Sequence, residues 1–425
     1  MKQILRPRLL FHQLSWIYSA SAVRFMTPLI VLPVMATRLG ASEFGRLSFI
    51  LIWAAFLSIA VEGGFLAAAT RLAVSAGPAY RWRIAQQVFT ARSVLSLLAV
   101  LGAVLAAYWS DQPRLHGQGA NRWLDASTIA GLAIALGWPA TWYLQATQQL
   151  NRWAKVEIMV HGIAILLTIA FVKSVVAYVL LQGAAATLLA LWGWRWLYRD
   201  LKSEVECGPL WSAGQMLPGF RLGWTMMPVS IAGAAYSLAL PAIGSRHISS
   251  AELGYYFLID RVVRALLAAI DPIISLIYLR IVQLFEIDEK NALRYATRWA
   301  FIGLVLGICF FGGGELAWLV KEKYEFRWIG GMSNEQLHAT FIVLGWLLPM
   351  LMGWKFVGCW ILASRRYDRA YRLSIIGGAG VGLLGASIAA SAEGLAWTAI
   401  SAEMAVILVA IVGVWFKRRA PSNAN

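Results

Sequence analysis

Long apolar stretches separated by short polar segments follow one another along almost the whole chain. Many exceed about 18 residues, which lets an α-helix cross a hydrocarbon core of about 30 Å. A backbone surrounded by lipid must satisfy its own hydrogen bonds, so these stretches predict membrane-spanning helices. Twelve spans are predicted, with bounds good to a few residues: 12–36, 46–70, 84–109, 127–150, 156–172, 174–194, 222–243, 252–279, 299–320, 337–363, 373–390 and 394–416.

The composition agrees with this pattern. Hydrophobic residues make up 60% of the 425 residues and charged residues only 14%, whereas soluble domains carry roughly 45–50% and about 25%. We therefore predict an all-α polytopic membrane protein, and a water-soluble enzyme is excluded. The first apolar stretch is too long for the core of a signal peptide, so we expect it to be retained.

The placement of the basic residues predicts the orientation in the membrane. Of the 37 Lys and Arg residues, 23 lie on the side of the N-terminus, nine on the opposite side and five within spans. Positive charge accumulates on the cytoplasmic side, so both termini are expected there, in a bacterial inner membrane. The net charge of +16 thus reflects topology rather than a nucleic-acid partner. Segments 38–45, 110–126, 244–251 and 321–336 are expected to be periplasmic, and 280–298 cytoplasmic.

Motifs of soluble catalysis are missing from the sequence. Cys207, Cys309 and Cys359 are widely spaced, and the five histidines show no HExxH spacing, so no metal site or cofactor is predicted. The GxGxxG pattern at 380–385 lies inside a hydrophobic span with no strand before it, which favours helix packing over nucleotide binding. No GxxxxGK[ST] loop occurs, so we do not expect ATP to drive this chain directly.

A weak internal repeat divides the chain in two. Glu43-Phe44-Gly45 follows the first span and Glu252-Leu253-Gly254 follows the seventh, at a constant offset of 209 residues. With six spans in each half, this predicts two six-helix bundles, residues 1–205 and 206–425, a repeat arrangement common in transporters.

Prolines in the first span of each half suggest hinges. Pro28 and Pro33 lie in the first span, and Pro228 and Pro241 in the seventh. A proline removes a helix hydrogen bond and allows a bend, which suits alternating access. The competing interpretation is that membrane helices tolerate prolines in general.

Ionisable side chains inside the spans are the strongest functional signal, because each costs a few kcal/mol unless it faces a partner or a polar cavity. Among them are Arg24, Glu62, Arg92, Asp260, Arg261, Arg264, Asp271, Lys355 and Glu403. In span 252–279, Asp260, Arg264 and Asp271 fall on one stripe at about 100° per residue. One interpretation is that Asp260 and Arg264 merely neutralise each other at i and i+4. The other is a polar lumen.

A lumen is favoured by two bases, Arg24 and Lys355, that have no acid at helical spacing on their own helices. This cationic surplus predicts an anionic ligand such as phosphate. The predicted basic lining is Arg24, Arg264 and Lys355, with Arg261 beside it. The acids Glu62, Asp260 and Asp271 are expected either to pair with these bases or to carry a coupling cation. Gln145 and Trp142 in 139–150 offer amide and aromatic surfaces suited to sugars.

Several stretches together resemble the polysaccharide transporter flippases (Wzx-type, for O-antigen and exopolysaccharide), which share a superfamily with MATE drug exporters and lipid II flippases. "RLGASEFG" at 38–45 is similar to the loop after their first helix, and "EGGFLAAATR" at 62–71 to a helix 2 signature with Glu62 in place of Asp. "PATWYLQATQQL" at 139–150 resembles a helix 4 segment, with Ala146 in place of Gly. Residues 253–281 resemble helix 8, with Asp260 in place of Glu and Leu279 in place of Pro.

The resemblance implies two six-helix bundles forming a V around a central cavity. It also implies that an undecaprenyl-pyrophosphate-linked oligosaccharide moves from the cytoplasmic to the periplasmic leaflet for lipopolysaccharide or exopolysaccharide synthesis. Other implied partners are membrane lipid, H+ or Na+ as coupling ion, and the polysaccharide polymerase machinery. This would be a secondary transporter and not an enzyme.

Two other functions compete with the flippase. A MATE-like antiporter of cationic drugs would need a net acidic lumen, whereas the bases Arg24 and Lys355 stand out here. A polysaccharide polymerase or ligase would need a sizeable periplasmic loop with catalytic groups, and the predicted periplasmic loops are short.

Overall fold

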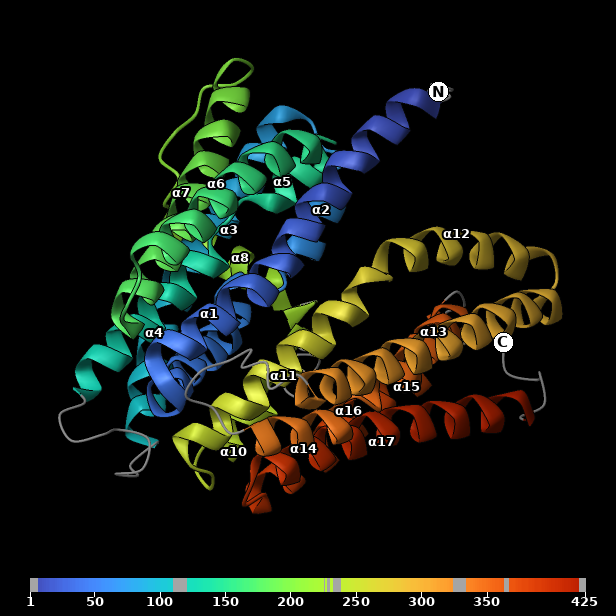
Figure 1. Ribbon diagram of the computed structural model, residues 1–425. Coiled ribbons are helices and arrows are strands. Elements are labelled where there is room, and N and C mark those ends of the chain that lie inside the picture. The colour runs from blue at the N-terminus through green and yellow to red at the C-terminus, as the bar shows by residue number, and fades with distance from the viewer. Residues whose placement is uncertain are drawn as a thin grey trace. The chain divides into compact units, whose positions relative to one another are not determined.

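The computed structural model describes residues 7–109, 121–224, 226–227, 230–231, 238–323, 334–362 and 367–419. Within these ranges the side chains at 7–18, 20–22, 24–26, 272, 275–276, 279, 283, 286, 321–323, 368 and 418–419 are not described. Every regular element that the described residues form is a helix, as the all-α prediction requires, and the helices are labelled in Figure 1.

The helices up to residue 224 are α1 (Pro7–Glu62), α2 (Phe65–Ala73), α3 (Pro78–Trp109), α4 (Arg122–Gly137), α5 (Thr141–Ala146), α6 (Leu150–Phe171), α7 (Val175–Lys202), the 3-10 helix η1 (Ala213–Gln215) and α8 (Met216–Trp224). The later ones are α10 (Leu240–Gly244), α11 (Ser250–Ala269), α12 (Asp271–Ile287), α13 (Glu289–Lys323), α14 (Asn334–Leu344), α15 (Leu347–Leu362), α16 (Asp368–Ile388) and α17 (Ala392–Arg419).

Eight helical stretches of the described chain are long and apolar enough to cross a membrane. Their outer faces keep large apolar side chains exposed, such as Leu97, Leu166, Leu384 and Ile388, and lipid is the environment in which such faces are stable. The protein is therefore a multi-pass helical membrane protein. The count of twelve spans stays a prediction.

The chain forms two compact units. The first unit consists of residues 1–27 and 46–234, and the second of residues 28–45 and 235–425. Helix α1 thus contributes its middle part to the second unit. The division at residue 205 that the repeat suggests stays a prediction, and the segment that follows α7 lies in the first unit.

Four predicted spans prove to be broken helices. The predicted spans 46–70, 127–150, 252–279 and 337–363 are each divided between at least two helices. Gly64, the N-cap of α2, has the left-handed φ of 74° that favours glycine. Pro139 lies between α4 and α5, and a proline stands in the first turn of α12, where its missing N–H costs nothing. Breaks at membrane depth leave backbone groups that other residues must satisfy.

Two expected loops are helical. The segment 280–298 was expected to be a loop, but α12 runs to Ile287 and α13 begins at Glu289. The segment 38–45 is helical except at Gly40, whose φ of 74° and ψ of 171° separate two helices within α1. Both segments are polar enough to look like loops, but amphipathic helices that leave the membrane carry the same composition.

The four hinge prolines have different surroundings. Pro28 and Pro33 lie inside α1, and Gly40 is the residue with non-helical dihedrals in that helix. Pro241 lies in the first turn of α10, where it begins a helix. Pro228 lies outside the described residues. The hinge function of these prolines stays a prediction.

The two copies of the repeated motif cross each other in the second unit. A Cβ atom added to Gly45 would lie 1.6 Å from the Ser250 carbonyl oxygen, and one added to Gly254 would lie 3.1 Å from Phe44. The Ser250 hydroxyl donates a hydrogen bond to the Ser42 carbonyl at 2.6 Å. Glycine is needed because the two backbones approach closely.

Candidate functional site

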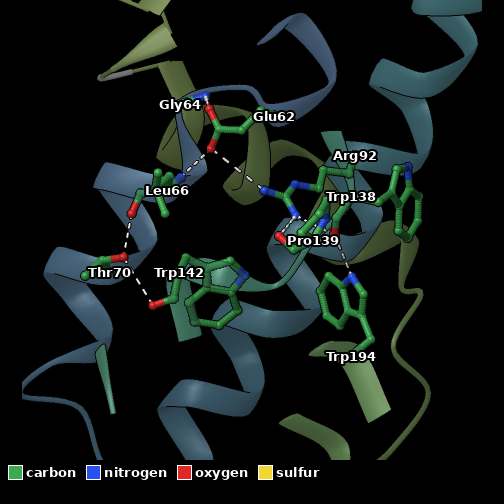
Figure 2. A network of polar contacts seen from close by, with 9 residues as sticks. All are labelled: Glu62, Gly64, Leu66, Thr70, Arg92, Trp138, Pro139, Trp142 and Trp194. Carbon is green, nitrogen blue, oxygen red and sulfur yellow. Dashed lines mark hydrogen bonds and ion pairs between the residues drawn. The ribbon is translucent and has the colours of Figure 1, made fainter. Parts of the chain in front are cut away.

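Glu62 ends α1 and caps α2 in the first unit. Its carboxylate accepts hydrogen bonds from the backbone N–H of Gly64 at 2.9 Å and from that of Leu66 (Figure 2). These N–H groups have no partner within α2, and the positive end of the helix dipole favours a negative charge there. Glu62 is therefore held in place by the backbone N–H donors at the start of α2.

Arg92 of α3 is buried beside Glu62 and crosses the break between α4 and α5. Its Nη1 donates to the carbonyl oxygens of Trp138 at 2.9 Å and Pro139 at 3.0 Å, and its Nη2 lies 3.8 Å from the Glu62 carboxylate (Figure 2). The indole of Trp194 donates to the same Trp138 carbonyl at 2.9 Å. Arg92 thus satisfies carbonyls that the helix break leaves open. The sequence marked Arg92 as an intramembrane charge but assigned it no function.

Glu62 lines two cavities. The first, called the Thr70 cavity, has a volume of about 450 Å³, and the second, the His161 cavity, about 390 Å³. The Thr70 cavity is lined by Glu62, Gly64, Leu66, Ala67, Thr70, Arg71, Gln145 and Ser230. The His161 cavity is lined by Ser58, Glu62, Leu66, Arg92, Leu136, Gly137, Pro139, Thr141, Trp153, Glu157, His161, Gln182, Ala186 and Leu189.

The two residues predicted to contact sugar are placed differently. Gln145 is exposed and lines the Thr70 cavity. Trp142 is fully buried in the core of the first unit, where the Thr70 hydroxyl donates to its carbonyl oxygen at 3.2 Å. Within the described residues its indole nitrogen has no hydrogen-bond partner. Of this pair, Gln145 is the one open to a ligand.

In the second unit, Asp260 and Arg264 of α11 form the ion pair expected from their spacing. Arg264 Nε lies 2.7 Å and 2.9 Å from the two Asp260 carboxylate oxygens, and Asp260 is buried. The guanidinium of Arg261 lies over the ring of Phe257, 4.7 Å from its centroid. The geometry of Asp260 and Arg264 is therefore that of the neutralising interpretation.

Lys355 of α15 has no acid at helical spacing on its own helix, but it pairs with an acid from another helix. Its Nζ lies 2.5 Å from the Asp271 carboxylate and donates to the Leu267 carbonyl oxygen at 3.1 Å. Leu267 is in the last turn of α11 and Asp271 opens α12, so Lys355 binds both sides of the helix break. Helical spacing along one span could not reveal this partner, because Asp271 comes from a different helix.

The charges inside the second unit are balanced more closely than the sequence suggested. Glu403 of α17 is buried, and Arg264 and Lys355 are near enough to act on it electrostatically. Three acids, Asp260, Asp271 and Glu403, thus accompany Arg261, Arg264 and Lys355 among the described interior groups. The side chain of Arg24 lies outside the described residues, so its position in a common basic lining stays a prediction.

Comparison with solved structures shows what fold this arrangement belongs to. A structure titled as an inward-facing multidrug resistance MATE family transporter of the MOP superfamily is similar with a TM-score of 0.61 and 12% identity, over 95% of this chain and 97% of that one. The lipid II flippase MurJ in an inward closed conformation is similar with a TM-score of 0.60 and 12% identity, over 93% and 87%. No curated protein sequence matches significantly.

The chain therefore shares the fold of these two polytopic helical membrane proteins. The sequence profile of the family described as "Polysaccharide biosynthesis protein" matches residues 10–284, more than half of the chain. The chain belongs to this family.

Proposed function

We propose that the protein is a flippase that moves undecaprenyl-pyrophosphate-linked oligosaccharide repeat units from the cytoplasmic to the periplasmic leaflet of the inner membrane. It works by alternating access and supplies lipopolysaccharide or exopolysaccharide synthesis. Family membership supports the pathway, and the fold shared with the lipid II flippase MurJ supports lipid-linked transport. The products would pass to polysaccharide polymerase machinery.

One observation supports the proposal that the substrate has an anionic group. Arg264 and Lys355 each keep 29% of the side chain exposed although both are paired with an aspartate. A paired base that is still accessible can exchange its carboxylate for a phosphate oxygen, and arginine can grip phosphate through two parallel bonds. We propose that Arg24, Arg264 and Lys355 bind the pyrophosphate, assisted by Arg261, while Gln145 contacts sugar.

An ion gradient supplies the driving force in this proposal, because the chain has no phosphate-binding loop of the Walker type. Glu62, Asp260 and Asp271 are the proposed acids for coupling to H+ or Na+. Undiminished net transport in liposomes after every ion gradient has been collapsed would leave only passive facilitation.

The decisive experiment is transport of a fluorescent lipid-linked oligosaccharide by the purified protein in liposomes. Arg264→Ala and Arg24→Ala are expected to lose transport and to leave a flippase-null strain without surface polysaccharide, with normal protein level and insertion. Arg46→Ala is the matched control, because Arg46 pairs with Asp125 at the same 2.7 Å but is not in the proposed lining. Full complementation by Arg24→Ala and Arg264→Ala would contradict the pyrophosphate site.

A MATE-like cation or drug antiporter is the second candidate, and the similarity to a multidrug MATE transporter favours it. The balanced charges of the second unit remove the argument that a cationic interior excludes cationic substrates. Efflux of a cationic dye, measured in the same liposomes beside the lipid-linked oligosaccharide, separates the two functions.

The proposed orientation places both termini in the cytoplasm. Single cysteines introduced into 244–251 are expected to react with impermeant thiol reagents from the periplasm, and those in 280–298 only after the membrane is opened. Labelling of 280–298 from outside would reverse the orientation.

A further inference from the structure

A groove in the second unit combines basic and apolar side chains on one helix. It has a volume of about 770 Å³, and its described lining consists of Leu293, Arg294, Thr297, Arg298, Phe301 and Ile302 of α13. Residues 294, 298 and 302 follow one another at intervals of four, and so do 293, 297 and 301, so the six side chains form one continuous stripe along the helix. None of them belongs to the proposed substrate site.

The stripe lies on the outward side of α13. Ala292 and Ala296, each two residues before an arginine and thus about 200° away around the helix, are fully buried. A Cβ atom added to Gly303 would lie 2.3 Å from a backbone carbonyl oxygen of α15, so α15 packs against the buried side. Phe301 and Ile302, by contrast, are 66% and 43% exposed. Of the eight candidate membrane-spanning stretches, the one in α13 has the smallest buried share, so most of its surface is open to lipid.

The two arginines mark the end of the apolar part of α13. After Arg298 the helix carries no charged residue until Glu315, and one turn before Arg294 it carries a third base, Lys290. A phospholipid has its groups in the same order, because a charged phosphate is followed by apolar acyl chains. The predicted orientation puts this end of α13 on the cytoplasmic side, where anionic lipids attract clustered bases.

No acid among the described residues neutralises the two arginines. Arg294 and Arg298 are exposed, and neither makes an ion pair or a hydrogen bond with another described residue. The described acids nearest to them along the chain are engaged elsewhere. Asp288 accepts a backbone N–H at the start of α13 at 2.8 Å, and Glu289 accepts the Tyr367 hydroxyl at 2.9 Å. Like charges four residues apart on a helix repel each other, and an anion between them removes the repulsion.

From this arrangement we propose that the groove on α13 binds an anionic phospholipid, whose phosphate lies between Arg294 and Arg298 and whose acyl chain runs along Phe301. Arginine can hold a phosphate through two parallel hydrogen bonds. The Thr297 hydroxyl already donates to a backbone carbonyl of the same helix at 2.9 Å, so the guanidinium groups supply the donors. Bound lipid holds this end of α13 at the level of the headgroups, whatever substrate the protein moves.

The test counts the lipids bound to the purified full-length protein in detergent by native mass spectrometry, with phosphatidylglycerol and phosphatidylcholine that carry identical acyl chains. The wild type is expected to prefer phosphatidylglycerol. Arg294→Gln and Arg298→Gln should each weaken phosphatidylglycerol binding about fivefold, and the double variant about thirtyfold, as expected for one and two bases close to an anionic lipid. Phe301→Ala should weaken the binding of both lipids equally, because it changes only the acyl-chain contact.

A double substitution in α7, Arg195→Gln with Arg199→Gln, is the matched control. These two arginines have the same spacing, are also exposed and are also expected on the cytoplasmic side. The control should bind phosphatidylglycerol like the wild type, and an equal loss would mean general surface attraction and overturn the site. Thermal unfolding without added lipid checks that the variants fold, and if the double variant in α13 does not, the single ones carry the test.

Three further results would overturn the proposal. The first is equal affinity of the wild type for both lipids, and the second is undiminished phosphatidylglycerol binding by the Arg294→Gln and Arg298→Gln double variant. The third is displacement of the lipid by inorganic phosphate at an equal concentration, because free phosphate lacks the acyl contacts. Undecaprenyl pyrophosphate is added in a separate arm. If it binds to the groove and phosphatidylglycerol does not, the groove is a substrate site and the phospholipid proposal fails.

Discussion

Arg92 in the first unit and Lys355 in the second solve the same structural problem in different ways. Each comes from a neighbouring helix and donates to the backbone at a helix break. Arg92 faces Glu62 at the end of α1, and Lys355 faces Asp271 at the start of α12. Arg92 is 1% exposed and holds two carbonyls, with Glu62 at 3.8 Å. Lys355 is 29% exposed on its side chain and holds one carbonyl, with Asp271 at 2.5 Å.

The difference indicates which base is structural and which can act on a ligand. A buried guanidinium that completes two backbone hydrogen bonds cannot leave without removing a donor from both carbonyls. A half-buried ammonium on a flexible stem can turn from its carboxylate to another anion at small cost. We therefore assign Arg92 to the fold of the first unit and Lys355 to the proposed substrate site.

Removal of Arg92 should have the largest effect on stability. Arg92→Ala leaves two carbonyls and Glu62 without their cation, and loss of one partner of a buried pair costs about 3–5 kcal/mol. We expect a large drop in thermal unfolding temperature in detergent and low membrane levels. Arg92→Lys should recover only part, because an ammonium lacks the fork that reaches both carbonyls. Wild-type stability of Arg92→Ala would refute the structural assignment.

Substitution of Lys355 should reduce transport strongly and stability only slightly. Lys355→Ala is expected to reduce transport at least about tenfold while changing the unfolding free energy by only about 1 kcal/mol, typical of a partly exposed pair. Lys355→Arg should retain more transport than Lys355→Ala, because it keeps the charge. If Lys355→Ala is as destabilising as Arg92→Ala, the two bases are equivalent and the comparison fails.

Substitutions of the acids Glu62 and Asp271 should have the smallest effects on stability. Glu62→Gln is expected to cost about 1–2 kcal/mol, since it weakens the hydrogen bonds to α2 and removes the charge facing a buried arginine. Asp271→Asn should cost about 0.5 kcal/mol, because the Asp271 side chain is 49% exposed and water replaces its contacts. Unfolding of both variants side by side measures the difference, and a reversed order would contradict it.

Much of the fold could be predicted from local pattern. The predicted spans 84–109, 299–320 and 394–416 fall within α3, α13 and α17, since apolar length alone decides whether a stretch can cross a membrane. The breaks were harder to foresee. Gly64 and Pro139 are visible in the sequence, but membrane helices contain many glycines and prolines that do not end them, as Pro33 inside α1 shows.

The sequence predicted which charged residues lie within the spans, but for most of them it did not predict the partner. The sequence marked Arg92, Lys355 and Glu403 as charges within spans, and the i, i+4 pair of Asp260 and Arg264 followed from helix geometry. His161 and Glu157 were not singled out from the sequence, although both lie within the predicted span 156–172. Their spacing of four residues was the available signal.

The sequence by itself determined that this chain is a multi-pass helical membrane protein with charges buried in its spans, because hydropathy and helical period are local properties. Only the tertiary structure decided which charges meet. Arg92 finds its carbonyls 46 and 47 residues away, and Lys355 finds Asp271 84 residues away. Such pairs depend on the rotation and depth of each helix against its neighbours, and packing sets both after the spans have formed.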